Sequence, residues 1–123
     1  MPKKIMVVDD EENLLELVKV IFEEENFEVV TAVSGQDCLK KLESSKPDLI
    51  LLDMMMPKMT GKETVKKIRE NPKTKDIKII FLTVARLSEV GLEDLKKLDI
   101  LDYITKPFDN DDLVRRVKKA LGA

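Results

Sequence analysis

The chain has 123 residues, of which 43% are hydrophobic and 37% are charged, a balance that predicts one soluble domain and excludes a disordered chain. Its 22 basic and 24 acidic side chains give a formal charge of −2, which argues against direct binding to nucleic acid. No apolar run approaches the roughly 20 residues of a membrane span. The one cysteine, Cys38, is expected to be a buried thiol, as in a cytoplasmic protein with no membrane insertion.

The first half of the chain alternates between short apolar runs and segments with helical spacing. An apolar run over residues 5–8 precedes a helical pattern over residues 14–22. Residues 27–31 predict a second strand, and Ser34 opens a second helix because Asp37 follows three residues later. Leu49 to Leu52 is the most apolar run, which is typical of a parallel strand covered on both faces. We therefore place it at the centre of a sheet.

The second half continues the alternation. Thr60 and Glu63 form a capping box, which predicts a third helix that ends before Asn71. Gly91 lowers the helix propensity of its segment by about 1 kcal/mol relative to Ala. The remaining predicted elements are strands over residues 77–82 and 101–105 and helices over residues 88–98 and 110–121.

Five strand and helix units with right-handed crossovers predict an α/β, flavodoxin-like doubly wound (βα)5 fold. The common small version has a parallel five-stranded sheet of order 2-1-3-4-5 with helices on both faces. No linker or repeat interrupts the pattern. We expect residues 1–123 to form a single domain without an output domain.

Polar residues follow four of the five strands. Asp9 and Asp10 follow the first strand, Asp53 the third, Thr83 the fourth and Lys106 the fifth. Because the carboxyl ends of parallel strands share one edge, these side chains are expected to lie together. Two like charges 4 Å apart cost about 4 kcal/mol at an effective dielectric near 20, so the acids favour a bound cation. Oxygen ligands without histidine favour Mg²⁺, with Mn²⁺ as an alternative, over zinc.

A carboxylate in such a place is a competent nucleophile toward phosphorus. Asp53 would lie between a divalent ion and the Lys106 ammonium, with the Thr83 hydroxyl as a hydrogen-bond donor. Catalysis of phosphoryl transfer is mostly positioning and charge neutralisation, which these groups supply. The predicted product is aspartyl phosphate at Asp53.

Four segments carry a resemblance to a known family. They are Val7-Val8-Asp9-Asp10-Glu11, Asp53-Met54-Met55-Met56-Pro57-Lys58-Met59-Thr60-Gly61, Thr83, and Tyr103-Ile104-Thr105-Lys106-Pro107-Phe108. Over residues 3–121 the sequence resembles the response-regulator receiver domains of two-component signalling, in particular stand-alone receivers similar to chemotaxis regulators.

The resemblance implies that Asp53 is the phosphoacceptor. A sensor histidine kinase or a phosphotransfer protein would donate the phosphoryl group in a Mg²⁺-dependent reaction. Asp10, Asp53 and the backbone carbonyl of Met55 would bind the ion, and Asp9 would reach it through water. Lys106 would pair with the phosphoryl group.

The resemblance also implies a switch. Thr83 would move toward the phosphoryl group and Tyr103 would turn from an outward to an inward rotamer. The surface formed by residues 88–98, 101–105 and 110–121 would then change and control a downstream protein target. The chain would be a signalling phosphoacceptor rather than an enzyme, and we expect a monomer.

The sequence departs from the family pattern at three places. Val84 occupies a position that is usually small, which is expected to narrow access to the phosphoryl site. Asp99-Ile100 replaces a Gly-Ala pair, which points to an unusual output surface. Thr60 replaces a common Asp, but a Thr cap begins a helix equally well.

Plainer interpretations stay open for single residues. The acids at 9–12 suit a helix N-terminus, and Tyr103 suits a half-buried strand. The methionines at 54–56 and 59 predict loop packing rather than a soft-metal site, because the other ligands there are hard oxygens. The basic residues at 115, 116, 118 and 119 predict a solvated helix face.

Three other functions compete with the signalling switch. A haloacid-dehalogenase-type phosphatase would also attack with an aspartate, but it requires a second acid where Met55 stands. A flavin carrier is disfavoured because the acids at 9–12 would repel a phosphate. A phosphorylation-independent interaction module would not need the acids or Lys106.

Overall fold

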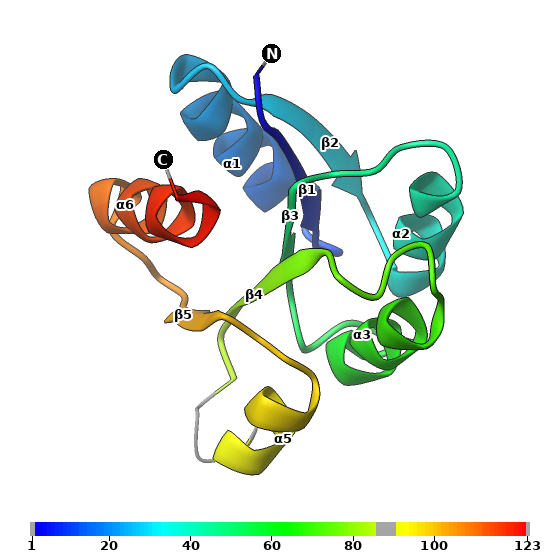
Figure 1. The fold of residues 1–123 in the computed structure, drawn as a ribbon. Helices are drawn as coiled ribbons and strands as arrows, with labels where there is room; N and C mark the ends of the chain where they lie inside the picture. The colour runs from blue at the N-terminus through cyan, green and yellow to red at the C-terminus, as the bar shows by residue number, and fades with distance from the viewer. Residues whose placement is uncertain (1, 86–90, 123) are drawn as a thin grey trace.

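One parallel sheet organises the computed structural model, which describes residues 2–85 and 91–122 (Figure 1). The strand order is β2-β1-β3-β4-β5, so the predicted fold class is confirmed and β3 is central. The strands are β1 (Lys4–Val8), β2 (Glu28–Ala32), β3 (Leu49–Leu52), β4 (Lys78–Thr83) and β5 (Asp102–Thr105). The helices are α1 (Glu12–Glu24), α2 (Gly35–Leu42), α3 (Gly61–Glu70), α5 (Leu92–Lys97) and α6 (Asn110–Leu121).

The sheet separates two apolar cores because successive strand residues point to opposite faces. Met6 and Val8 of β1 pack with residues of α2 and α3 in one cluster, called the first core, and Cys38 is buried there as predicted. Ile5 and Val7 pack in the other cluster, with residues of α1 and α6. Figure 1 shows α2 and α3 on one side of the sheet and α1 and α6 on the other. All four residues of β3 are buried, as a central parallel strand requires.

Two predicted helix starts are confirmed by their caps. The Ser34 hydroxyl accepts a hydrogen bond from the Asp37 N–H at 3.0 Å. The Thr60 hydroxyl accepts from the Glu63 N–H, and the Glu63 carboxylate accepts from the Thr60 N–H, both at 3.2 Å. These bonds satisfy backbone donors that the first turn of a helix leaves without partners.

Helix α5 differs from the prediction of a helix over residues 88–98. Gly91 has a φ of 84°, which ends any helical path through it, and α5 begins at Leu92. The predicted start, at residues 88–90, lies outside the described residues.

Asp99 and Ile100 form the turn that ends α5. The Asp99 N–H donates to the Lys96 carbonyl, and the Ile100 N–H donates to the Leu95 carbonyl. Asp99 has a φ of 55°, so these bonds form a Schellman motif with aspartate in the place that glycine usually takes. Ile100 and Leu95 both pack against the first core, which supplies the apolar contact of that motif.

The basic residues of α6 are largely matched by acids. Arg116 contacts Asp112 at 3.1 Å and Asp102 at 3.2 Å, and Lys118 contacts Glu25, the residue after α1, at 2.7 Å. These surface pairs agree with the predicted solvated face. Within residues 2–85 and 91–122, the search for a membrane-crossing helix found none of sufficient length and apolarity.

Candidate functional site

The carboxyl ends of the strands bring four of the predicted residues together: Asp9, Asp10, Asp53 and Lys106. The backbone ladder continues past the strands: the Asp53 N–H donates to Val8 O at 3.0 Å, and the Lys106 N–H donates to Thr83 O at 2.9 Å. The Asp9 N–H donates to Ala32 O at 3.1 Å. The residues that directly follow β1, β3 and β5 are therefore held by a neighbouring strand, which fixes where their side chains begin.

Three carboxylates form a cluster at this edge. One oxygen from each of Asp9, Asp10 and Asp53 lies within 4.8 Å of the other two. Asp9 is 2% exposed and Asp53 is 4% exposed, whereas Asp10 is open to solvent. Two nearly buried acids beside a third, exposed acid form an oxygen-rich site with one open side.

Lys106 lies between the two buried acids. Its Nζ is 2.6 Å from Asp9 Oδ2 and 3.4 Å from Asp53 Oδ2. Burial raises the pKa of Asp9, although hydrogen bonds from Lys106 and from the Glu11 N–H act in the opposite direction. Burial also lowers the pKa of Lys106, but the hydrogen bond to Asp9 and the nearby carboxylate charges outweigh it and raise that pKa overall. The ammonium is thus held in its charged form.

Each buried acid uses its second oxygen to hold the loop that follows it. Asp9 Oδ1 accepts from the Glu11 N–H at 2.9 Å, and Asp53 Oδ1 accepts from the Met55 N–H at 3.0 Å. Such bonds to the backbone two residues onward are typical of aspartate in turns. The family resemblance implies the Met55 carbonyl as a metal ligand, and the structure places the Met55 N–H beside Asp53.

Helix α3 begins against the backbone of Asp53. The Gly61 N–H donates to Met54 O at 2.9 Å, and a Cβ atom at Gly61 would lie 2.5 Å from both Asp53 O and Met54 Cα. Only glycine permits this approach, because the atoms in the way belong to the main chain. The first residue of α3 is therefore fixed to Asp53.

Thr83 and Tyr103, the two residues of the predicted switch, lie on the neighbouring strands β4 and β5. Thr83 is fully buried, and its hydroxyl accepts from the Ala85 N–H at 3.3 Å. Tyr103 lies opposite Phe81, two residues before the Thr83–Thr105 pair, and packs half-buried against the first core. Val84, in contrast, is 60% exposed.

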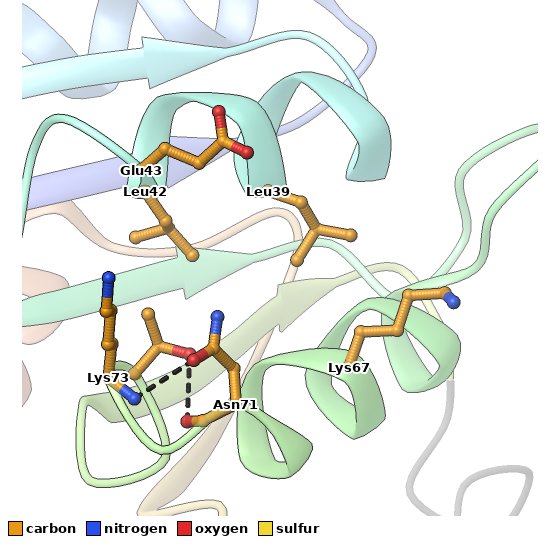
Figure 2. Close-up of a pocket in the computed structure, with 7 residues that line it drawn as sticks. Leu39, Leu42, Glu43, Lys67, Asn71 and Lys73 are labelled. Carbon is orange, nitrogen blue, oxygen red and sulfur yellow. Dashed lines mark hydrogen bonds between the residues drawn. The ribbon is translucent and has the colours of Figure 1, made fainter.

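Two cavities differ in where they lie relative to the acidic cluster. One of about 610 Å³ is lined by Asp10, Glu11, Glu12, Asn13 and Val33, beside the acidic cluster. Another of about 470 Å³ lies between the C-terminal ends of α2 and α3, where Leu39 and Leu42 face Lys67 and Asn71 (Figure 2). Because none of the predicted site residues lines the second cavity, the acidic cluster is the candidate site.

Contacts from α3 to α5 could not be found by reading the sequence. Arg69 of α3 bonds to carbonyls at the end of α5, and Lys62 of α3 contacts Asp94 of α5. No motif singles out these residues, because each partner lies about 30 residues away and two of the acceptors are main-chain atoms.

Comparison with known proteins agrees with this geometry. The family model described as response regulator receiver domain matches residues 5–118. The chain is 41% identical over 122 residues to the alkaline phosphatase synthesis transcriptional regulatory protein PhoP of Bacillus subtilis, covering 98% of this chain and 49% of that protein. It is also 41% identical to the transcriptional regulatory protein CpxR of Escherichia coli, covering 96% and 49%. The chain spans about half the length of these curated relatives.

Solved structures give the same result. The chemotaxis protein CheY4 of Vibrio cholerae superposes with a TM-score of 0.91 at 28% identity, covering 98% of this chain and 99% of that one. The response regulator TrrA of Thermotoga maritima, in complex with Mg(2+)-BeF, is 42% identical with a TM-score of 0.82, covering 96% and 98%. With a family match over most of its length and an acidic cluster at the expected strand ends, this chain belongs to the response regulator receiver domains.

Proposed function

We propose that this receiver domain takes a phosphoryl group onto Asp53 from a histidine kinase or a phosphotransfer protein. The observation that carries the proposal is the nearly buried Asp53 carboxylate beside Asp9, Asp10 and the Lys106 ammonium. A phosphoryl group adds negative charge at this point, and a positive environment must balance it. Membership of the family supports a role in two-component signalling rather than as a classical enzyme.

The transfer step follows from this arrangement. An Asp53 carboxylate oxygen attacks the phosphorus of a phosphohistidine, so that an O–P bond forms as the P–N bond breaks. The electron pair of the broken bond goes to the imidazole nitrogen of the donor, which leaves as neutral imidazole because its other ring nitrogen carries a proton. Lys106 offsets charge on the transferred group, because its ammonium already lies 3.4 Å from Asp53 Oδ2.

The residues present fit a magnesium ion. Asp9, Asp10 and Asp53 offer carboxylate oxygens within 4.8 Å of one another, and hard oxygen donors are what Mg²⁺ prefers. We assign these three residues and the Met55 carbonyl to the ion, which when bound would neutralise charge on the phosphoryl oxygens. The Mg(2+)-BeF complex of the similar TrrA supports this assignment. Replacement of Mg²⁺ by Mn²⁺ stays a prediction.

We further propose that the modified site changes the surface of α5, β5 and α6 and so controls a downstream protein. Thr83 would turn toward the phosphoryl group, and Tyr103 would follow because it lies on the adjacent strand. The half-buried position of Tyr103, packed against the same core as Leu95 of α5, supports this role.

The test is direct phosphorylation. Incubation with acetyl phosphate and Mg²⁺ is expected to add the mass of one phosphoryl group, and EDTA is expected to prevent it. Asp53→Asn should stay unmodified, while Asp48→Asn, a change at an acid before β3, should be modified like the parent. An unchanged parent mass, or equal labelling of Asp53→Asn, would contradict the proposal and favour a phosphorylation-independent interaction module.

A further inference from the structure

Helix α5 is joined to α3 by charged contacts at both of its ends. Near the start of α5, Asp94 Oδ2 lies 2.6 Å from Lys62 Nζ. At its end, Arg69 Nε donates to Leu98 O at 2.9 Å and Arg69 Nη2 donates to Asp99 O at 3.0 Å. We call Lys62 and Arg69, with these partners, the α3–α5 clasp.

Arg69 also fixes the chain that leads into β4. Its Nη1 donates to Lys75 O and to Ile77 O, both at 2.7 Å. One guanidinium thus holds four main-chain carbonyls from two separate segments. Two of them belong to the end of α5, where a helix leaves carbonyls without partners.

The position of α5 depends on these contacts because the helix is weak by itself. It has six residues, fewer than an isolated helix needs to form in water. Its described apolar side chains, Leu95 and Leu98, are only partly buried against the first core. Contacts with α3 are therefore a large share of what orients it.

The N-terminal end of α3, where Lys62 lies, is in contact with Asp53. Gly61 is in contact with the backbone of Asp53 and Met54, and Lys62 is the next residue. A shift of the loop at 54–60 would move Gly61 and Lys62 together, because both belong to the first turn of α3. Asp94 would be drawn with them through the ion pair.

We propose that Lys62 and Arg69 are positioning residues that transmit the state of Asp53 to α5 along α3, by a route separate from Thr83 and Tyr103. Only the part of the proposal that concerns the phosphorylated state rests on the proposed function. The clasp itself is a property of the unmodified protein, so its two parts are tested separately.

The first part of the test measures amide hydrogen exchange of the peptide that contains residues 92–100, in the full chain without ligand. Lys62→Met keeps the apolar stem and removes the charge, and exchange there is expected to rise about two- to fivefold, the range for an exposed ion pair. Lys66→Met is the matched control, because Lys66 is exposed on the same helix and the described contacts do not join it to α5. The double change Lys62→Glu with Asp94→Lys is expected to restore slow exchange.

The second part adds Mg²⁺ and beryllofluoride as the probe of the phosphorylated state. In Thr83→Ala the probe is expected still to change exchange in residues 92–100. In Thr83→Ala with Lys62→Met that response is expected to fall by at least half, while Thr83→Ala with Lys66→Met keeps it.

Two results would overturn the proposal. One is equal exchange of residues 92–100 in Lys62→Met and Lys66→Met, which would show that the ion pair does not hold α5. The other is complete loss of the probe response in Thr83→Ala alone, which would leave no separate route. Failure of Asp53 to take a phosphoryl group would overturn the proposed function, yet the first part would still decide whether the clasp orients α5.

Discussion

Lys106 places one positive charge where the site is expected to hold a cation. Its ammonium contacts Asp9 at 2.6 Å, more closely than it contacts Asp53. The ammonium and a metal ion would therefore draw on the same carboxylate. The effect of this competition on the affinity for Mg²⁺ can be measured.

We predict that Lys106→Met binds Mg²⁺ more tightly than the parent. A unit charge and a divalent ion about 5 Å apart repel by about 1.7 kcal/mol even at the dielectric of bulk water, so the affinity is expected to rise by at least about tenfold. Titration calorimetry with MgCl₂ measures it, and Lys66→Met, a change at an exposed lysine away from the acids, serves as a control for loss of a lysine elsewhere. Weaker binding would show that Lys106 orders the acids instead of competing for them.

Cys38 gives a second prediction at this scale. Burial, with a smaller contribution from the charge of Asp37, raises the pKa of its thiol to about 12. At pH 8 the native thiol should react with a disulfide reagent at least about a hundredfold more slowly than in guanidinium chloride, because the thiolate is the reactive form.

The same shift links the stability of the fold to pH. The folded pKa of Cys38 lies above its ordinary value of 9.0, so the contribution of the neutral thiol is complete below pH 9 and is lost as the pH rises toward 12. Urea unfolding at pH 8 and pH 10.5 measures the loss. A Cys38→Ala variant whose stability falls equally between these pH values would assign the loss to other groups.

At the scale of elements, local signals were sufficient for most helices. The predicted helix over residues 110–121 coincides with α6 because Asp109 caps its first turn and Gly122 takes a left-handed conformation after its last. The acidic cluster could be predicted as well, since the ends of parallel strands must share an edge. The clasp could not be predicted, because Arg69 finds its acceptors through tertiary packing and they are backbone atoms.

The end of α5 yields a prediction about stability. Asp99 adopts a left-handed conformation, which costs a residue with a Cβ atom about 1 kcal/mol. Arg69 bonds to the backbone carbonyl of Asp99, and a glycine at this position would provide the same carbonyl. We expect Asp99→Gly to raise the free energy of unfolding by about 0.5 kcal/mol, after the greater freedom of glycine in the unfolded chain is subtracted. Urea denaturation measures it. A loss of stability would show that the Asp99 carboxylate, and not only its carbonyl, holds Arg69.

At the scale of the whole molecule, the one tyrosine allows the predicted switch to be tested. The chain has one tyrosine and no tryptophan, so ultraviolet emission comes almost entirely from this residue. If phosphorylation of Asp53 turns Tyr103 inward, Mg²⁺ with beryllofluoride should change the tyrosine emission by a measurable fraction in the parent. Asp53→Asn should show no change, and Thr83→Ala should show a reduced one. An unchanged parent emission would contradict the predicted rotation of Tyr103.

The sheet divides the interior into two compartments, and among residues 2–85 and 91–122 the two clusters have no side chain in common. Residues of α1 and α6 fill one, and residues of α2, α3 and α5 fill the other. Substitutions in different compartments, such as Val18→Ala and Ile68→Ala, should therefore add in their effects on stability. For a lineage of such domains this means that one side of the molecule is free to diversify, acquiring new recognition, while inherited packing on the opposite side is preserved.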